Sequence, residues 1–323
     1  MPILDLPLDK LRTYTGRNPR PADFDAFWQQ SREELATIAP EVELKPAAFQ
    51  TPLAICSNLY FSGTHGARVH AKLLRPKHRP ADGSPILLHF HGYSGNSGDW
   101  INLLPWVASG FTVAAMDCRG QGGLSEDIGP ARGGTLYGHV VKGLDDTPDR
   151  LYYRNVFLDT ARLAEVVRGL DGVNPDRVAS MGGSQGGALA LICAALVPEV
   201  SRTVSMHPFL CDYQRVWEMD QAKAAYIGLY EYFRRFDPRH EREVEAFTRL
   251  GYIDVQHHAP SIQAEVLMAT GLMDPICPPS TQFAAYNKIR TPKDIAIYPD
   301  FHHEMLPGFY DQAYGFLGRG WVM

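Results

Sequence analysis

The sequence lacks three features that would assign it quickly to a class of protein. Its formal net charge at pH 7 is -5, so it has no basic excess with which to bind nucleic acid or an anionic membrane. It has no run of 18 consecutive apolar residues, so no transmembrane helix is predicted. Its first residues, 1–5, lack the basic start and apolar core of a signal peptide, so no export signal is predicted.

Cysteine is scarce and scattered. The five cysteines are odd in number and form no Cys-x-x-Cys pair, so neither a zinc knuckle nor a disulfide framework is indicated, and a reducing cytoplasm is favoured. A metalloprotease motif is also missing. His303-Glu304 has no second histidine at the required spacing, and Pro307 would break the helix that such a motif needs. No metal or other cofactor is therefore predicted.

The chain does have enough apolar residues, 45% of 323, to form a sizeable core. We expect one α/β domain over residues 1–323. Residues 1–40 are predicted to form an N-terminal arm and a helix. Alternation over residues 43–76 predicts antiparallel strands.

From residue 85 onward, short apolar runs alternate with helical segments, which favours a mostly parallel sheet with crossover helices. A loop over about 118–150 carries eight glycines. The next helix is predicted to end at Gly172 with Asn174-Pro175. The expected strands cover residues 85–91, 111–117, 178–181, 202–207, 266–270 and 294–298.

Residues 209–260 interrupt this alternation with charged helical segments that contain many aromatic residues. This helical insertion after strand six has two interpretations, which the sequence leaves open. It is either a set of ordinary amphipathic helices with aromatic side chains inward, or a lid over the ligand crevice at the carboxyl ends of the strands.

The stretch Gly182-Gly183-Ser184-Gln185-Gly186 lies between an apolar strand and a helix rich in Ala and Leu. Gly-x-Ser-x-Gly at a strand-to-helix turn is the nucleophile elbow of α/β-hydrolases. The Ser184 hydroxyl would then project over the positive end of the following helix. A glycine-rich loop with an idle serine is the alternative, and the motif alone does not exclude it.

A serine nucleophile needs an adjacent base, which a third group orients, and in α/β-hydrolases the order is Ser, then Asp or Glu, then His. Asp274 follows the strand ending near residue 270 and is the predicted acid. Asp300 is the alternative acid. The base is expected in Phe301-His302-His303-Glu304, and the spacing does not choose between the two histidines.

Attack on a carbonyl carbon places negative charge on its oxygen, which two N–H donors must stabilise. One is expected from Gln185, the residue after the nucleophile. The other is expected from Tyr93, in the loop after the strand at 85–91. The Tyr93 ring either forms a wall of the acyl pocket or simply packs.

With these features in place, the chain resembles the acetyl xylan esterases and cephalosporin C deacetylases grouped as carbohydrate esterase family seven. The resemblance covers nearly the whole chain, including the stretches 14–19, 90–93 and 271–279. The motifs that carry it are Arg119-Gly120-Gln121, Gly182-Gly183-Ser184-Gln185-Gly186 and His303-Glu304.

The resemblance implies an α/β-hydrolase fold and a preference for acetyl over longer acyl esters. It also implies a homohexamer whose active sites open toward an interior cavity. His302 stands where the family usually has glycine, which leaves the acyl range and the pH optimum open. The implied roles are Ser184 as nucleophile, Asp274 as acid, His303 as base, Tyr93 and Gln185 as oxyanion donors, and Arg119, Gly120 and Gln121 as a supporting loop.

We therefore predict a cytoplasmic, metal-free serine esterase that removes acetyl groups from small acetylated substrates through an acetyl-enzyme. Acetylated xylo-oligosaccharides and esters similar to cephalosporin C are the expected substrate class. A peptidase or lactone hydrolase with the same elbow is an alternative. A non-catalytic binding protein on a hydrolase fold is a second alternative.

Overall fold

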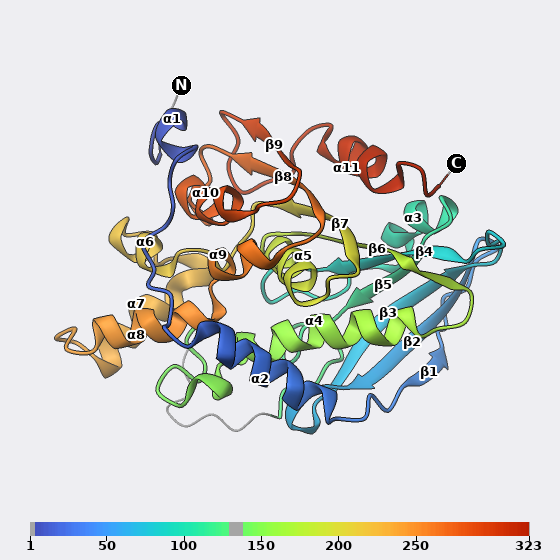
Figure 1. The fold of residues 1–323 in the computed structure, drawn as a ribbon, viewed down its shortest axis with the longest axis horizontal. Helices are drawn as coiled ribbons and strands as arrows, with labels where there is room; N and C mark the ends of the chain where they lie inside the picture. Colours follow the sequence, from blue (N-terminus) through green and yellow to red (C-terminus); the bar gives the residue numbers. More distant parts are fainter. Residues whose placement is uncertain (1–3, 129–137, 323) are drawn as a thin grey trace.

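One sheet organises the part of the chain that the computed structural model describes, residues 4–128 and 138–322. Its nine strands within those residues lie in the order β1-β2-β3-β5-β4-β6-β7-β8-β9 (Figure 1). They are β1 (Glu43–Pro46), β2 (Ala54–Ser62), β3 (Arg68–Pro76), β4 (Ser84–Phe90), β5 (Thr112–Met116), β6 (Val173–Gly183), β7 (Val200–Met206), β8 (Glu265–Gly271) and β9 (Lys293–Tyr298).

The direction of the strands confirms the mostly parallel sheet. β1, β2, β3 and β5 pair antiparallel in that order, as the alternation over residues 43–76 predicts for the first three. All neighbours from β5 through β4 to β9 are parallel. Parallel pairing brings the carboxyl ends of these strands to one edge of the sheet, where ligands bind in open α/β folds.

One predicted boundary is wrong. The helix before β6 ends at Arg168, and β6 begins at Val173, so Asn174-Pro175 lies inside the strand and does not end the helix. The pairing of β6 with β4 shifts between Ser84↔Val173 and Ile86↔Val178. This irregularity accommodates a proline, which has no N–H to donate to a neighbouring strand.

Helices cover both faces of the sheet, because successive strand residues point to opposite sides. In β4, Leu88 belongs to a buried cluster that includes side chains of α2, α4 and α5, whereas Leu87 belongs to a second cluster that includes side chains of α3 and α11. The helices are α1 (Leu8–Leu11), α2 (Phe24–Ala36), α3 (Leu104–Ala108), α4 (Tyr152–Arg168), α5 (Gln185–Leu196), α6 (Tyr213–Glu218), α7 (Ile227–Phe236), α8 (Glu243–Leu250), α9 (Val255–His258), α10 (Pro279–Lys288) and α11 (Phe309–Gly318).

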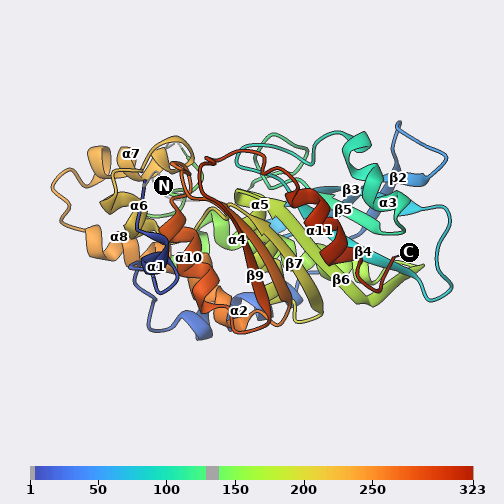
Figure 2. The ribbon, with the colours of Figure 1, turned by 90° about the horizontal axis from the view of Figure 1, so that it is seen from above.

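The helical insertion predicted over 209–260 is present as α6 to α9, between β7 and β8. The insertion follows the seventh strand of the structure and not the sixth, because the count includes the short edge strand β1. Tyr226, Tyr232 and Phe233 are buried, whereas Tyr230 and Phe236 are exposed, so the aromatic side chains of this segment point inward only in part. Figures 1 and 2 place α6, α7 and α8 at one end of the molecule, beside the N-terminal segment.

One side chain of the insertion makes several of its contacts with the N-terminal segment. The carboxylate of Asp212 accepts hydrogen bonds from the Tyr14 hydroxyl at 2.8 Å, from the Arg17 N–H at 3.0 Å and from the Asn18 N–H at 2.8 Å. These three residues belong to the stretch 14–19 that carries part of the family resemblance. The stretch therefore has a structural role, which is to fasten the arm to the insertion.

Two further expectations concern membrane spans and the long loop. Among the described residues, no helix is both long enough and apolar enough to cross a lipid bilayer. The glycine-rich loop over 118–150 contains a short 3-10 turn at Pro148–Arg150, and its residues 129–137 lie outside the described part of the chain.

The close contact of α5 with β4 leads to a test of stability. A Cβ added at Gly186 would lie 2.0 Å from the Phe90 carbonyl oxygen, so Gly186→Ala must push the helix away from the strand. We expect a loss of about 1–3 kcal/mol in the free energy of unfolding, measured by urea denaturation.

Gly315→Ala in α11 is the matched control. A Cβ at Gly315 meets nothing within 4 Å, so the same substitution there gains helix propensity. We expect it to leave the free energy of unfolding unchanged or to raise it by up to about 1 kcal/mol. Equal losses at the two positions would contradict the assigned contact.

Candidate active site

The sheet brings together three residues that are far apart in the sequence. Ser184 follows the end of β6, Asp274 follows β8 by three residues, and His303 follows β9 by five. The registers Gly183↔Met206, Met206↔Ala269 and Gly271↔Tyr298 place these strand ends at the same edge of the sheet. This is the edge at which the sequence predicts the site.

Ser184 occupies a strained turn between β6 and α5. Its φ of 58° and ψ of -119° lie outside the regions that L-residues ordinarily adopt. Two hydrogen bonds hold this conformation: the Ser184 N–H donates to the Met206 carbonyl at 2.8 Å, and the Phe209 N–H donates to the Ser184 carbonyl at 3.1 Å. This is the backbone geometry of a nucleophile elbow.

Asp274 and His303 form a hydrogen-bonded pair beside the elbow. His303 Nδ1 lies 2.8 Å from Asp274 Oδ2, and Asp274 is fully buried. The other carboxylate oxygen, Oδ1, accepts the N–H groups of Ile276 and Cys277, each at 2.9 Å. Asp274, and not the alternative Asp300, is therefore the carboxylate that contacts this histidine.

The two adjacent histidines have different surroundings. The side chain of His303 is 22% exposed and contacts the buried acid. The side chain of His302 is 59% exposed, and its Nδ1 lies 3.7 Å from Glu304 Oε1. The structure thus brings His303, the histidine that the resemblance implies, into the site and leaves His302 at the surface.

The Ser184 hydroxyl contacts a thiol. Burial raises the pKa of Cys277 well above its usual value, and a hydrogen bond from Ser184 opposes that shift only in part. The thiol is therefore protonated at neutral pH and is a weak nucleophile beside the serine. No hydrogen bond among the described residues joins Ser184 to His303; such contacts are often long before substrate binds.

The two predicted oxyanion donors lie on either side of the elbow. Gln185 is the first residue of α5, so its backbone N–H lies at the positive end of a 12-residue helix. Tyr93 follows β4, and its hydroxyl accepts the N–H of His139 at 2.9 Å. The Tyr93 ring lies 5.6 Å from the ring of Phe209, which follows the strand next to the elbow.

The side chain of Gln185 is fully buried, and the Gln121 amide pairs with it. Gln121 Nε2 donates to Gln185 Oε1 at 2.8 Å, and Gln185 Nε2 donates back to Gln121 Oε1 at 3.1 Å. Gln121 Oε1 also accepts the N–H of Ser94 at 2.9 Å. Gln121 therefore links the loop that carries Tyr93 to the first turn of α5.

Arg119 fixes the same loop to α4. Its guanidinium makes two hydrogen bonds to the Asp159 carboxylate, at 2.7 and 2.5 Å, and both side chains are fully buried. Its carbonyl accepts the Tyr152 hydroxyl at 2.6 Å. Gly120, with a φ of +64°, makes the turn between Arg119 and Gln121. These contacts agree with the supporting role that the resemblance implies.

His207 is not among the site residues predicted from the sequence. This buried histidine follows the end of β7, and its Nδ1 lies 3.4 Å from Asp274 Oδ2. Burial lowers the pKa of the His207 ring, so the neutral form is favoured. Its position immediately after a parallel strand, at the edge that carries the site, is the one sequence signal it has, and that signal does not record the contact with Asp274.

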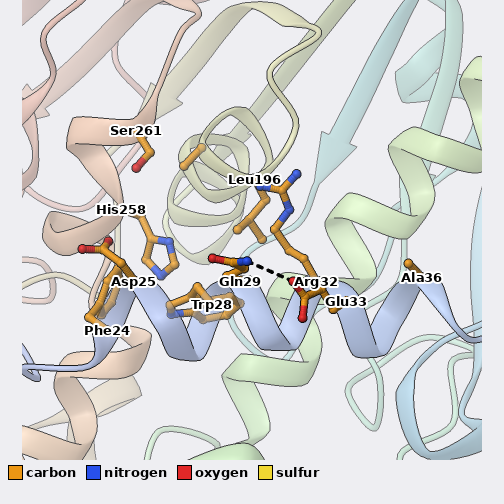
Figure 3. Close-up of a pocket in the computed structure, with 11 residues that line it drawn as sticks. Phe24, Asp25, Trp28, Gln29, Arg32, Glu33, Ala36, Leu196, His258 and Ser261 are labelled. Carbon is orange, nitrogen blue, oxygen red and sulfur yellow. Dashed lines mark hydrogen bonds between the residues drawn. The ribbon is translucent and has the colours of Figure 1, made fainter.

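A cavity of about 580 Å³ lies elsewhere, between α2 and the end of α5 (Figure 3). Its lining includes Trp28, Arg32, Leu196 and His258. Figure 3 also shows the hydrogen bond from Gln29 to Glu33 across one turn of α2. None of the predicted site residues lines this cavity, so it is separate from the elbow.

Comparison with known proteins identifies the family. The family profile described as acetyl xylan esterase (AXE1) matches residues 1–319. The chain belongs to the acetyl xylan esterase family. This confirms the resemblance drawn from the motifs.

Two solved acetyl xylan esterases are similar to this chain along almost its whole length. Acetyl xylan esterase 1 from Thermoanaerobacterium sp. JW/SL YS485 is 55% identical, with a TM-score of 0.95 over 97% of this chain and 98% of that one. The acetyl xylan esterase from Paenibacillus sp. R4 is 34% identical, with a TM-score of 0.92 over 97% and 99%. Both likenesses confirm the α/β-hydrolase fold.

A longer relative is the acetyl esterase Axe7A of Xylanibacter ruminicola, which is 28% identical over 299 residues. The match covers 91% of this acetyl xylan esterase family member but 65% of the relative. Acylaminoacyl peptidase from Pyrococcus horikoshii is 16% identical, with a TM-score of 0.54 over 78% of this chain and 38% of that one. This last likeness shows a shared fold alone.

The Arg119–Asp159 pair leads to a stability prediction for this family member. Asp159→Asn leaves a buried guanidinium without its carboxylate, which costs about 3–5 kcal/mol. Urea denaturation of the variant is expected to show a loss of that size. The exposed pair Arg239–Glu241 supplies the control: Glu241→Gln should change the free energy of unfolding by less than about 1 kcal/mol. Similar losses in the two variants would show that the buried pair is not structural.

Proposed function

We propose that this acetyl xylan esterase family member is a serine carboxylesterase that removes acetyl groups from small acetylated substrates. The observation that supports this most strongly is the hydrogen bond between His303 and the buried Asp274, at the sheet edge where Ser184 forms the elbow. Acetylated xylo-oligosaccharides are the proposed substrate class, and acetyl esters similar to cephalosporin C are proposed as further substrates.

In the first half of the reaction, Ser184 Oγ attacks the acetyl carbonyl carbon while His303 Nε2 takes the hydroxyl proton. Asp274 accepts the hydrogen bond from His303 Nδ1–H, so it holds the tautomer whose Nε2 is free to accept a proton. The same carboxylate stabilises the imidazolium that forms. His303 then protonates the leaving alcohol, which leaves an acetyl group on Ser184.

The negative oxygen of the tetrahedral intermediate binds to the backbone N–H groups of Tyr93 and Gln185. Loss of one such donor costs roughly 3–4 kcal/mol of transition-state stabilisation. The amide pair of Gln121 and Gln185 fixes the spacing of these donors, because it joins the loop after β4 to α5. Water then attacks the acetyl group by the same steps, and His303 again acts first as base and then as acid.

The acyl preference is assigned to the Tyr93 ring and to the insertion that faces it. Phe209 opens the segment that leads into α6 to α9 and contacts the Tyr93 ring. An aromatic pair in this position limits the space for the acyl chain beyond a methyl group. The insertion thereby acts as a lid that forms one wall of the pocket.

The assembly and location of the protein are also proposed. A homohexamer with sites that face an interior cavity rests on the family resemblance, and sedimentation velocity tests it. A cytoplasmic location agrees with the five cysteines, all of which are buried and free.

The first test of the reaction is Ser184→Ala, with 4-nitrophenyl acetate as the substrate. Removal of the nucleophile is expected to lower kcat by about 10⁴–10⁶-fold, as measured by nitrophenol release. Turnover at the wild-type rate would end the serine esterase proposal. Failure of an organophosphonate to label Ser184 in the wild-type protein would favour a binding protein instead.

Asp274→Asn tests the acid. It should lower kcat by about 10⁴-fold, since the amide favours the wrong tautomer of His303. The matched control is Asp300→Asn, which changes an exposed carboxylate in the neighbouring loop and should leave kcat within about threefold. A larger effect at Asp300 would assign the acid to that residue.

A third test concerns the acyl group. We expect kcat/KM for the acetyl ester to exceed that for the butyryl ester by at least about tenfold. Tyr93→Leu keeps the backbone N–H but removes the ring, so it should raise the butyryl-to-acetyl ratio of kcat/KM. An unchanged ratio would show that the ring only packs, and a preference for a peptide substrate would favour a peptidase.

A further inference from the structure

His207 adds a second imidazole to the carboxylate that holds His303. Its Nδ1 lies 3.4 Å from Asp274 Oδ2, and the centres of the His207 and His303 rings are 5.2 Å apart. The ring is buried and follows β7, whereas Asp274 follows β8 and His303 follows β9. The segments that follow three neighbouring strands therefore bring His207 Nδ1, Asp274 Oδ2 and His303 Nδ1 close together.

The hydrogen bonds of His207 decide its tautomer. Nε2 lies 3.1 Å from the carbonyl oxygen of Glu304, which can only accept, so Nε2 carries the proton. Nδ1 of the neutral ring then has a lone pair. The Gly271 N–H reaches this lone pair only at 3.4 Å, and the Asp274 carboxylate lies at the same distance. A lone pair and a carboxylate oxygen that face each other repel unless a cation lies between them.

We propose that His207 Nδ1, Asp274 Oδ2 and His303 Nδ1 form a binding site for a divalent transition-metal ion such as Zn²⁺. One possible ligand atom of each of the three residues lies within 4.8 Å of the other two. Tetrahedral zinc, with bonds of about 2.0–2.1 Å, holds its ligand atoms about 3.4 Å apart, which is the separation of His207 Nδ1 from Asp274 Oδ2. His303 Nδ1 lies 2.8 Å from Asp274 Oδ2 and would move away from it to reach about that distance.

The surrounding groups orient the ligands as in known zinc sites. The Nε2–H of His207 is fixed by a backbone carbonyl, which sets both the tautomer and the plane of the ring. Asp274 Oδ1 is held by two backbone N–H groups, so Oδ2 remains directed at the histidines. Two imidazoles favour zinc, copper or nickel over Mg²⁺ and Ca²⁺, which prefer oxygen ligands. The ion enters past His303, whose side chain is 22% exposed.

Binding of the ion inhibits the esterase, a consequence that rests on the proposed function, whereas binding itself does not. The ion takes the place of the proton on His303 Nδ1, and the neutral ring carries its single proton on Nε2 instead. In this form Nε2 cannot accept a proton from Ser184. The ion and the productive tautomer of His303 therefore exclude each other.

The experiment begins with EDTA-treated, dialysed wild-type protein and ZnCl₂. Isothermal titration calorimetry is expected to show one Zn²⁺ per chain, and hydrolysis of 4-nitrophenyl acetate is expected to stop as the site fills. EDTA should restore the rate. MgCl₂ at the same concentration should neither bind nor inhibit.

His207→Asn removes one ligand, and asparagine tolerates the positive φ of 45° at this position. We expect its affinity for Zn²⁺ to fall at least about tenfold, with inhibition compared against the variant's own zinc-free rate. His302→Asn is the matched control, because it removes an exposed histidine from the same loop as His303 and should keep the wild-type affinity. Wild-type affinity in His207→Asn would overturn the site.

Cobalt gives a readout that needs no variant. Co²⁺ in the wild-type site should show the visible absorption of a four- or five-coordinate ion, and only the weak spectrum of the hexa-aqua ion would overturn the proposal. Binding of Zn²⁺ through His207 without inhibition would keep the metal site and overturn the proposed role of His303. Inhibition that persists in His207→Asn would instead keep the esterase and overturn the site.

Discussion

A buried carboxylate at the end of β8 is the constraint on which the rest of the site depends. Asp274 is fully buried, and a buried charge is tolerated only when its oxygens are satisfied by donors. Two backbone N–H groups after β8, the Gln282 amide of α10 at 3.3 Å and the His303 ring after β9 supply them. An unpaired buried carboxylate would be strongly destabilising, so the segments after β8 and β9 must follow paths that bring these donors to Asp274. This requirement also sets the position of His303, the proposed base.

The elbow is strained, and two polar networks hold it from opposite sides. On the β7 side, the Met206 carbonyl and the Phe209 N–H bind the backbone of Ser184. On the β4 side, Gln121 pairs with the buried Gln185, and Arg119 is fixed to Asp159 in α4. A strained backbone conformation persists only where several surrounding interactions hold it in place. Arg119, Gly120 and Gln121 thus hold the loop beside the elbow in place.

Much of the fold is present in the sequence, because buried parallel strands leave short apolar runs that are easily recognised. The order of the motifs also places Ser184 and Asp274 at one edge of the sheet. The spacing does not separate His302 from His303, since adjacent residues on a loop differ only in where the loop turns. His207 is not predicted for a similar reason. Its proposed role comes from its contact with Asp274, 67 positions away, and no local sequence pattern records that contact. The start of β6 at Val173 is not predicted, because an irregularity in the strand pairing allows a proline to lie inside the strand.

The attachment of the N-terminal arm explains why the family resemblance extends far beyond the motifs that carry the chemistry. Asp212 lies six residues after the end of β7, in the segment that leads from Phe209 into the insertion. Its own N–H donates to the carboxylate of Asp254, and its carboxylate accepts three donors from residues 14–18. The arm therefore restrains the segment whose first aromatic ring contacts Tyr93.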